Sequence, residues 1–173
     1  MICQTGQPLA TIALKRLERF EGAVTFAGFL VLIAVVFADV ASREILGTGL
    51  HWAGQVGVYA NLFVILFGIG LASAGGTHLR PRFADNWLPG RWSGVLDRLQ
   101  DGVMALFCAA FSIVSAGFVY DGFILGERSA ILGIVIWPFQ AVFPLVFALA
   151  TFRHGLYALY PDLRPEPAGG EGE

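Results

Sequence analysis

The chain is 173 residues long, 56% of its residues are hydrophobic, 14% are charged, and its formal net charge is −2. A mean hydropathy of +0.69 is too high for a soluble domain of this size. The charge pattern excludes a nucleic-acid-binding protein, because basic and aromatic residues mix in one connector only and form no stripe. Cys3 and Cys108 lie in a terminal tail and in an apolar run, so no disulfide framework is expected. We therefore expect an all-α integral membrane protein.

Four apolar runs predict four transmembrane helices, because about 20 apolar residues cross a bilayer as a helix. The expected spans cover about residues 20–43, 52–77, 98–120 and 129–154, within a membrane domain of residues 14–160. The first run follows a basic segment but is too long for the apolar part of a signal peptide, so we interpret it as a retained anchor. Residues 1–13 form a tail, and residues 161–173, rich in Pro, Gly and Glu, are expected to be a disordered tail.

The fourth expected span contains two prolines, Pro138 and Pro144. Each proline removes one backbone hydrogen bond and is expected to bend the helix. In a membrane such a bend persists only where neighbouring protein groups satisfy the freed carbonyl groups. We therefore expect the fourth helix to pack against protein along much of its length.

Two short segments are predicted to lie at the membrane surface. Residues 14–21 alternate basic and apolar side chains at helical spacing, which is typical of an amphipathic lead-in to the first span. The connector of residues 78–92 mixes arginines with aromatic side chains, a composition that suits the headgroup layer. Its candidate contact residues are His78, Arg80, Arg82, Trp87 and Trp92.

An acid and a base stand four residues apart at the end of the first span, Asp39 before Arg43. This spacing places both side chains on one helix face. A charge near a helix end costs less than one at the bilayer centre, because it can reach the interface or pair. We expect an anchoring ion pair, with a contact to a partner subunit as the alternative. A turn at residues 47–49 then leads to Trp52, which opens the second span.

The basic residues predict the orientation of the chain. With a cytoplasmic N-terminus, nine of the 11 Lys and Arg residues lie in cytoplasmic segments, and only Arg43 and Arg128 lie outside. This distribution satisfies the positive-inside rule. Four spans then put both termini in the cytoplasm, and the protein is expected in the bacterial inner membrane.

The spans offer little that could carry transport or catalysis within this chain alone. A channel or carrier usually shows intramembrane charges or paired broken helices, and the interiors of these spans have no charge and no internal repeat. We expect no catalytic residue, no metal ligand and no cofactor. Small residues spaced four apart, Gly68 with Ala72 and Gly70 with Ala74, predict close helix packing, within the chain more than with a partner.

One alternative interpretation is a haem- or quinone-associated anchor subunit of a redox enzyme. His78 and His154 end the second and fourth spans on the same side, so their imidazoles could ligate a haem iron. We favour interfacial side chains for both, because each lies beside basic residues at the membrane surface. A stand-alone membrane scaffold is a third interpretation.

Three stretches together resemble a known membrane family: VASREILG at residues 40–47, the run from His51 to Pro89, and the run from Ser129 to His154. The sequence resembles the small four-helix membrane subunit of tripartite ATP-independent periplasmic (TRAP) transporters over about residues 14–160. The matching positions are Arg43, Trp52, Gly68, His78, Trp137, Pro138 and Pro144. The chain differs from the family pattern at Gly54 and Gln55 and at Arg80 and Arg82, where members carry acidic residues, so contacts through those carboxylates are expected to be absent or rebuilt.

The resemblance implies a division of labour between three proteins. A large multi-span permease subunit carries an organic acid and sodium, a periplasmic protein captures the solute, and this chain braces the large subunit in the membrane. The residues that select the solute then lie in other chains. Contacts to that partner or to lipid are expected at Asp39, Arg43, Trp52, His78, Arg80, Arg82, Trp87, Trp92, Trp137, Pro138 and Pro144.

Overall fold

The computed structural model describes residues 7–74 and 93–163, and its regular elements there are all helical. The helices are α1 (Gln7–Leu46), α2 (Ala53–Ala74), α3 (Ser93–Leu125), α4 (Trp137–Gln140), α5 (Val142–Leu159) and the 3-10 helix η2 (Pro161–Leu163). Four helical segments are long and apolar enough to cross a membrane: Ala10–Leu46, Ala53–Ala74, Arg98–Leu125 and Trp137–Leu159. The expected all-α membrane class with four spans is confirmed.

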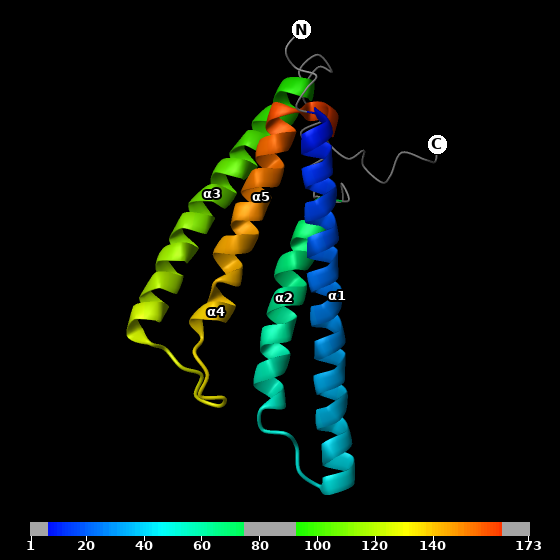
Figure 1. Ribbon diagram of the computed structural model, residues 1–173, viewed down its shortest axis with the longest axis vertical. Helices are drawn as coiled ribbons and strands as arrows, with labels where there is room; N and C mark the ends of the chain where they lie inside the picture. The colour runs from blue at the N-terminus through cyan, green and yellow to red at the C-terminus, as the bar shows by residue number, and fades with distance from the viewer. Residues whose placement is uncertain (1–6, 75–92, 164–173) are drawn as a thin grey trace, which may run out of the picture.

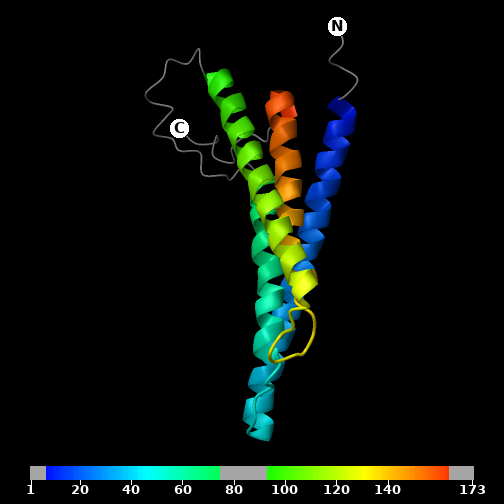
Figure 2. The same cartoon turned by 90° about the vertical axis from the view of Figure 1, so that its left-hand side faces the viewer.

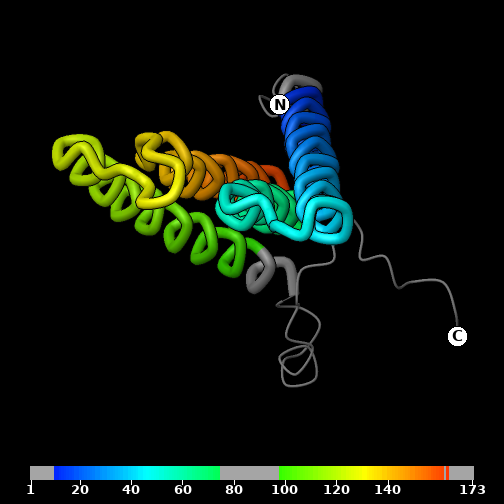
Figure 3. Tube along the Cα trace, turned by 90° about the horizontal axis from the view of Figure 1, so that it is seen from below, coloured from blue at the N-terminus to red at the C-terminus, as the bar shows by residue number. Residues whose placement is uncertain are grey.

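The spans form two helical hairpins. Figure 1 shows α1 beside α2 and α3 beside α5, and these two pairs make the most extensive contacts between elements. The starts of α1 and α3 and the end of α5 lie at one end of the bundle, as the view turned by 90° in Figure 2 also shows. Seen from below in Figure 3, α2 lies between α1 and the second hairpin, and α2 packs against α5. The α2–α5 contact is therefore the main link between the hairpins.

The hydrophobic core between the hairpins is small. Phe67 of α2 packs with Val142 and Val146 of α5, and partly buried neighbours surround them. Most other large apolar side chains of the spans remain exposed. Lipid tails are as apolar as leucine, so van der Waals packing and polar contacts, more than hydrophobic burial, must hold such helices together.

α1 is a single helix of 40 residues that begins at Gln7, so residues 7–13, which were expected to belong to the tail, are helical. The amphipathic segment 14–21 is continuous with the first span and is not a separate element. At 1.5 Å per residue such a helix is about 60 Å long, roughly twice the thickness of the hydrocarbon layer. Leu17 of this segment is buried, and Phe20 meets Phe67 of α2 edge-on with ring centroids 5.9 Å apart. The beginning of α1 therefore packs on the protein as well as reaching beyond the bilayer.

The turn between α1 and α2 is organised by Asp39. Its carboxylate pairs with the guanidinium of Arg43 and accepts a hydrogen bond of 2.8 Å from the backbone N–H of Leu50. Gly47 has a φ of +72°, and a Cβ on Gly49 would lie 2.9 Å from Nε of Arg43. The expected ion pair is confirmed, and it serves to fasten the turn.

The fourth span begins later than the sequence indicated. We expected a helix from Ser129, but residues 127–136 form a closed turn in which Ser129 donates its backbone N–H to the carbonyl of Ile134 at 2.8 Å. Gly133, with a φ of +66°, allows the reversal. The helix starts only at Trp137, so the span is shorter at its N-terminal end than expected.

The two prolines do not bend the interior of one long helix. Pro138 lies in the first turn of α4, where its missing N–H costs nothing. The helix is interrupted at Ala141, between α4 and α5, and Pro144 explains this break because its ring clashes with the carbonyl of the residue four earlier, Gln140. The carbonyl of Pro144 accepts a 3.0 Å hydrogen bond from Ser112 Oγ of α3, so the expected packing against protein is present there.

Replacing Asp39 tests the role of the turn. Asp39→Ala should lower the free energy of unfolding by about 1 kcal/mol, because it leaves the partly buried N–H of Leu50 without its acceptor. Asp39→Asn keeps an acceptor oxygen, and Arg43→Gln removes only an exposed charge pair, so each should cost less than about 0.5 kcal/mol. The measurement is reversible denaturation in mixed micelles; an equal loss in all three variants would contradict the proposed role.

Candidate functional site: a buried polar clasp

A buried ion pair joins the two hairpins near the end where the first span begins. Glu21 of α1 and Arg153 of α5 are both 1% exposed, and the carboxylate Oε2 pairs with Nη2 of the guanidinium. Nη1 of Arg153 donates to the backbone carbonyl of Gly70 in α2. Since an unpaired charge in a low-dielectric interior is very costly, each charge requires the other. One arginine therefore connects α1, α2 and α5.

Gly70 is the residue that lets this pair form. A Cβ at position 70 would lie 2.6 Å from Glu21 Oε1 and 2.9 Å from its carboxyl carbon. Only a residue without a side chain leaves room for the carboxylate against the α2 backbone. The small residues of the second span thus serve packing inside the chain at this position, as the sequence indicated.

The neighbouring residue of α5 makes a second polar contact. His154 is 6% exposed, its Nδ1 lies 3.1 Å from Oδ1 of Asp101 in α3, and its Nε2 lies 3.4 Å from Oγ of Ser73 in α2. Residues adjacent on a helix point about 100° apart, so Arg153 can face α1 while His154 faces α3. The two contacts together reach all four spans.

We call this group the polar clasp: Glu21, Gly70, Ser73, Asp101, Arg153 and His154. These side chains hold helices together, because the Glu21–Arg153 ion pair and the contact between Asp101 and His154 each cross a helix interface. Within residues 7–74 and 93–163, no three His, Cys, Asp or Glu side chains gather as potential metal ligands. The clasp is nevertheless the one place in the described part of the chain where ionisable side chains from different helices meet inside the bundle.

Sequence reasoning missed the clasp. The sequence predicts an interfacial side chain at His154, and this prediction is wrong, because His154 is 6% exposed and lies beside Asp101, which is 4% exposed. The available signal was that Glu21 and Arg153 have opposite signs and bound runs that reach the same side of the membrane.

The predicted interface residues do not form one site. Asp39 and Arg43 pair with each other at the far end of the bundle, and Trp52 lies partly buried just before α2. Trp137 meets Phe123 of α3 edge-on with ring centroids 5.5 Å apart, and Pro138 is exposed. The connector residues His78, Arg80, Arg82, Trp87 and Trp92 lie outside the described residues.

The geometry gives the haem-anchor interpretation no support. Both ring nitrogens of His154 lie within reach of other side chains, those of Asp101 and Ser73. A haem-ligating histidine needs one nitrogen directed at iron. The second histidine of that interpretation, His78, lies outside the described residues.

Replacing only one partner of the ion pair should lower the free energy of unfolding strongly. Arg153→Leu should destabilise the protein by about 3–5 kcal/mol, because it leaves the carboxylate of Glu21 buried and unpaired. The double variant Glu21→Leu with Arg153→Leu should recover most of that loss. Equilibrium unfolding in micelles measures the cycle; purely additive losses would show that the two side chains do not act as a pair.

Two glycines of α2 provide a matched comparison. Gly70→Ala should destabilise by about 1–3 kcal/mol, since the added methyl group displaces the Glu21 carboxylate. Gly68→Ala should be neutral or slightly stabilising, because the nearest atom to its Cβ would be Thr25 Cγ2 at 4.0 Å and alanine favours the helix. Similar losses in both variants, in the same unfolding assay, would argue against a specific role for Gly70.

Comparison with known proteins identifies the family. The family model described as "Tripartite ATP-independent periplasmic transporters, DctQ component" matches residues 32–164, well over half of the chain. Searches of curated proteins and of solved structures each gave no significant match. The matched region contains α2, α3, α4 and α5 and the last part of α1, residues 32–46, so it covers three spans fully and the first in part. The chain therefore belongs to the DctQ component family, the small membrane component of tripartite ATP-independent periplasmic transporters.

Proposed function

We propose that this chain is a non-catalytic subunit that braces a large sodium-coupled permease subunit in the membrane, in a transporter that takes up organic acids. A periplasmic binding protein would deliver the solute to the large subunit. Membership of the DctQ family supports these two partners. In this proposal the large permease subunit and the periplasmic binding protein select the solute, and this chain does not.

The proposal rests on one observation: the buried charged side chains contact other helices of the same chain. Glu21, Arg153 and Asp101 hold helices together at one end of the bundle and leave the helix faces to apolar side chains. On the outer faces, Phe37 of α1 and Leu106 and Ile113 of α3 are each 73% exposed. A solute route would need polar groups along the span. Apolar outer faces around a fastened interior suit a part that packs in the membrane beside another subunit.

The proposed orientation places the clasp on the cytoplasmic side. The beginnings of α1 and α3 and the end of α5 lie at that end (Figure 1). These parts of the helices contain the basic residues Lys15, Arg16, Arg19, Arg98 and Arg153. Arg43 and Arg128 lie towards the other end, in or next to the turns that join the helices of each hairpin. The positive-inside rule then puts those turns in the periplasm, where the binding protein would meet them.

Affinity purification tests the proposed complex directly. The tagged chain, extracted from its native host in mild detergent, should bring with it one large, many-spanning protein, and the preparation should be colourless. The measurement is mass spectrometry of the eluate with an absorbance scan of the same sample. A haem absorbance band, or a stable complex with a soluble redox subunit, would refute the proposal.

The connector is proposed to set the depth of the large subunit in the bilayer. Trp87→Ala with Trp92→Ala should reduce the yield of the complex more than it changes which solute is transported, because interfacial tryptophans anchor a segment at the headgroups. Tyr120→Ala, an exposed aromatic residue in α3, is the control and should leave the yield unchanged. Normal assembly and uptake in the double variant would count against an anchoring role.

A further inference from the structure

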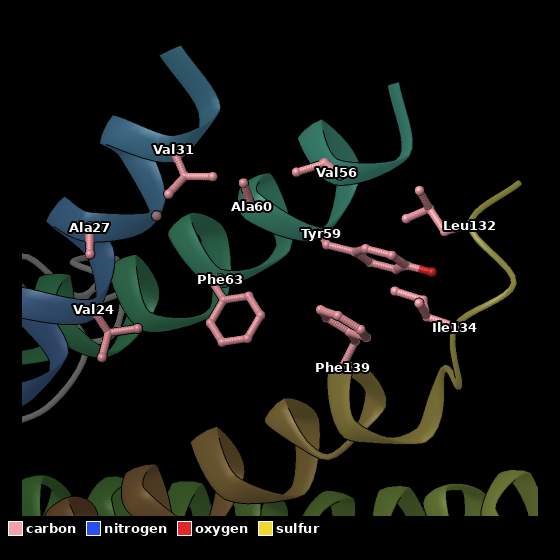
Figure 4. A pocket seen from close by; sticks show the side chains of 11 residues that line it. Val24, Ala27, Val31, Val56, Tyr59, Ala60, Phe63, Leu132, Ile134 and Phe139 are labelled. Atoms are coloured by element: carbon pink, nitrogen blue, oxygen red, sulfur yellow. The ribbon is translucent and has the colours of Figure 1, made fainter. Parts of the chain in front are cut away.

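The short helix α4 contacts both hairpins at the end of the bundle away from the clasp. Its Phe139 stacks on Tyr59 of α2 with ring centroids 4.2 Å apart, and its Trp137 meets Phe123 of α3 edge-on. Figure 4 shows Tyr59 and Phe139 beside each other at an apolar groove between the hairpins, which is lined by α1, α2, α4 and the turn after α3. Because the helix is interrupted at Ala141, side-chain contacts, in addition to the connection to α5, set where α4 lies.

The last residue of α4, Gln140, carries a buried polar atom without a partner. In the described part of the chain, its Oε1 is the one buried side-chain oxygen or nitrogen that forms no hydrogen bond. Such an atom has lost its bonds to water and gained none in return, so native structures rarely leave one unpaired. The surroundings of this amide therefore call for a donor or for another orientation of the amide.

Gly122 of α3 lets the Gln140 amide approach the helix backbone. A Cβ at position 122 would lie 2.7 Å from Oε1 of Gln140 and 3.6 Å from Oε2 of Glu127. Gly122 is buried, whereas Glu127, the first residue of the closed turn, is exposed. Two side chains from different segments therefore meet at this glycine, each with an oxygen close to it.

Two acceptor oxygens bond to each other only if one of the two groups supplies a hydrogen. A glutamine amide holds both kinds of atom, because Oε1 accepts and Nε2 donates. Rotation of the amide by 180° exchanges these atoms while the side chain fills the same space. Nε2 of Gln140 then takes the inner position, on the side of Gly122 where the Glu127 carboxylate lies. A donor paired with a carboxylate also forms a stronger bond than two neutral groups do.

We propose that Nε2 of Gln140 donates a hydrogen bond to the carboxylate of Glu127 in the space left by Gly122, and that this bond is a latch for α4. Backbone bonds already join the segments on either side: the N–H of Ile136 donates to the carbonyl of Glu127 at 3.1 Å. The latch adds a side-chain bond between the end of α4 and the segment that leaves α3. When it opens, α4 and the turn can leave α3 while the clasp still joins the hairpins. This inference does not rest on the proposed transport function.

Hydrogen–deuterium exchange of the full chain in nanodiscs tests the latch, because exchange of a bonded N–H reports local opening. The reporter is the peptide that contains Ser129 and Ile136, whose N–H groups donate across the turn at 2.8 and 3.1 Å. Exchange of the peptide that contains Val35, a buried residue in the middle of α1, should stay unchanged in every variant and shows that the fold is intact.

Variants of the two partners should release the turn. Gln140→Leu and Glu127→Ala should each speed exchange of the reporter peptide about fivefold, the effect of one net hydrogen bond. The double variant should be little faster than either single variant, because both remove the same bond. Gln140→Glu keeps the shape but replaces the donor with a second carboxylate, so it should speed exchange at least as much. Asp121→Ala, which removes another exposed carboxylate from the same end of α3, is the control and should have no effect.

Two glycines of α3 give a further comparison. Gly122→Ala should speed exchange of the reporter peptide at least fivefold, because its methyl group would displace the Gln140 amide. Gly117→Ala should leave exchange unchanged, because nothing lies within 4 Å of a Cβ at position 117.

Three results would overturn the proposal. Unchanged or slower exchange in Gln140→Leu would show that Oε1 is unpaired, because an apolar side chain then removes a cost. Additive effects in the double variant would show that Gln140 and Glu127 act separately. An effect of Asp121→Ala equal to that of Glu127→Ala would assign the change to charge alone.

Discussion

The structure depends on the requirement that a charge away from water must be paired. Glu21 and Arg153 are nearly inaccessible and come from the first and last spans, so the pair forms only when the two hairpins are in register. Gly70 supplies both the space for the carboxylate and a carbonyl for the guanidinium. In a bilayer, where apolar contact alone distinguishes poorly between arrangements of helices, such polar contacts select one of them.

The two ends of the bundle are therefore held together by different kinds of contact. Near the clasp, side chains from all four spans meet through hydrogen bonds and opposite charges. Towards the other end the hairpins are held by a small core around Phe67 and then diverge around the groove. Within each hairpin the turn is fastened separately, by Asp39 in the first and by the bonded turn around Ser129 in the second. Each hairpin is therefore a unit, and the clasp joins the units.

This arrangement suits a subunit whose outer surface meets lipid or another membrane protein. In the described part of the chain, most large apolar side chains of α1 and α3 remain exposed. The DctQ family places the protein in a multi-component transporter, which accounts for such a surface without requiring a solute path through these helices. The groove, enclosed on several sides by this same chain, is a different feature from those outer faces.

The sequence by itself determined the number of spans, the all-α class and the Asp39–Arg43 pair, because uncharged runs and i,i+4 spacing are local properties. It also carried the family resemblance, which the family match confirms. The tertiary structure decided where the fourth helix starts. The apolar composition from Ser129 onward fits a helix, but backbone hydrogen bonds across a turn, such as that from Ser129 to Ile134, hold this segment in another conformation. It alone decided the clasp, because Glu21 and Arg153 are 132 residues apart and their pairing depends on how the helices face one another.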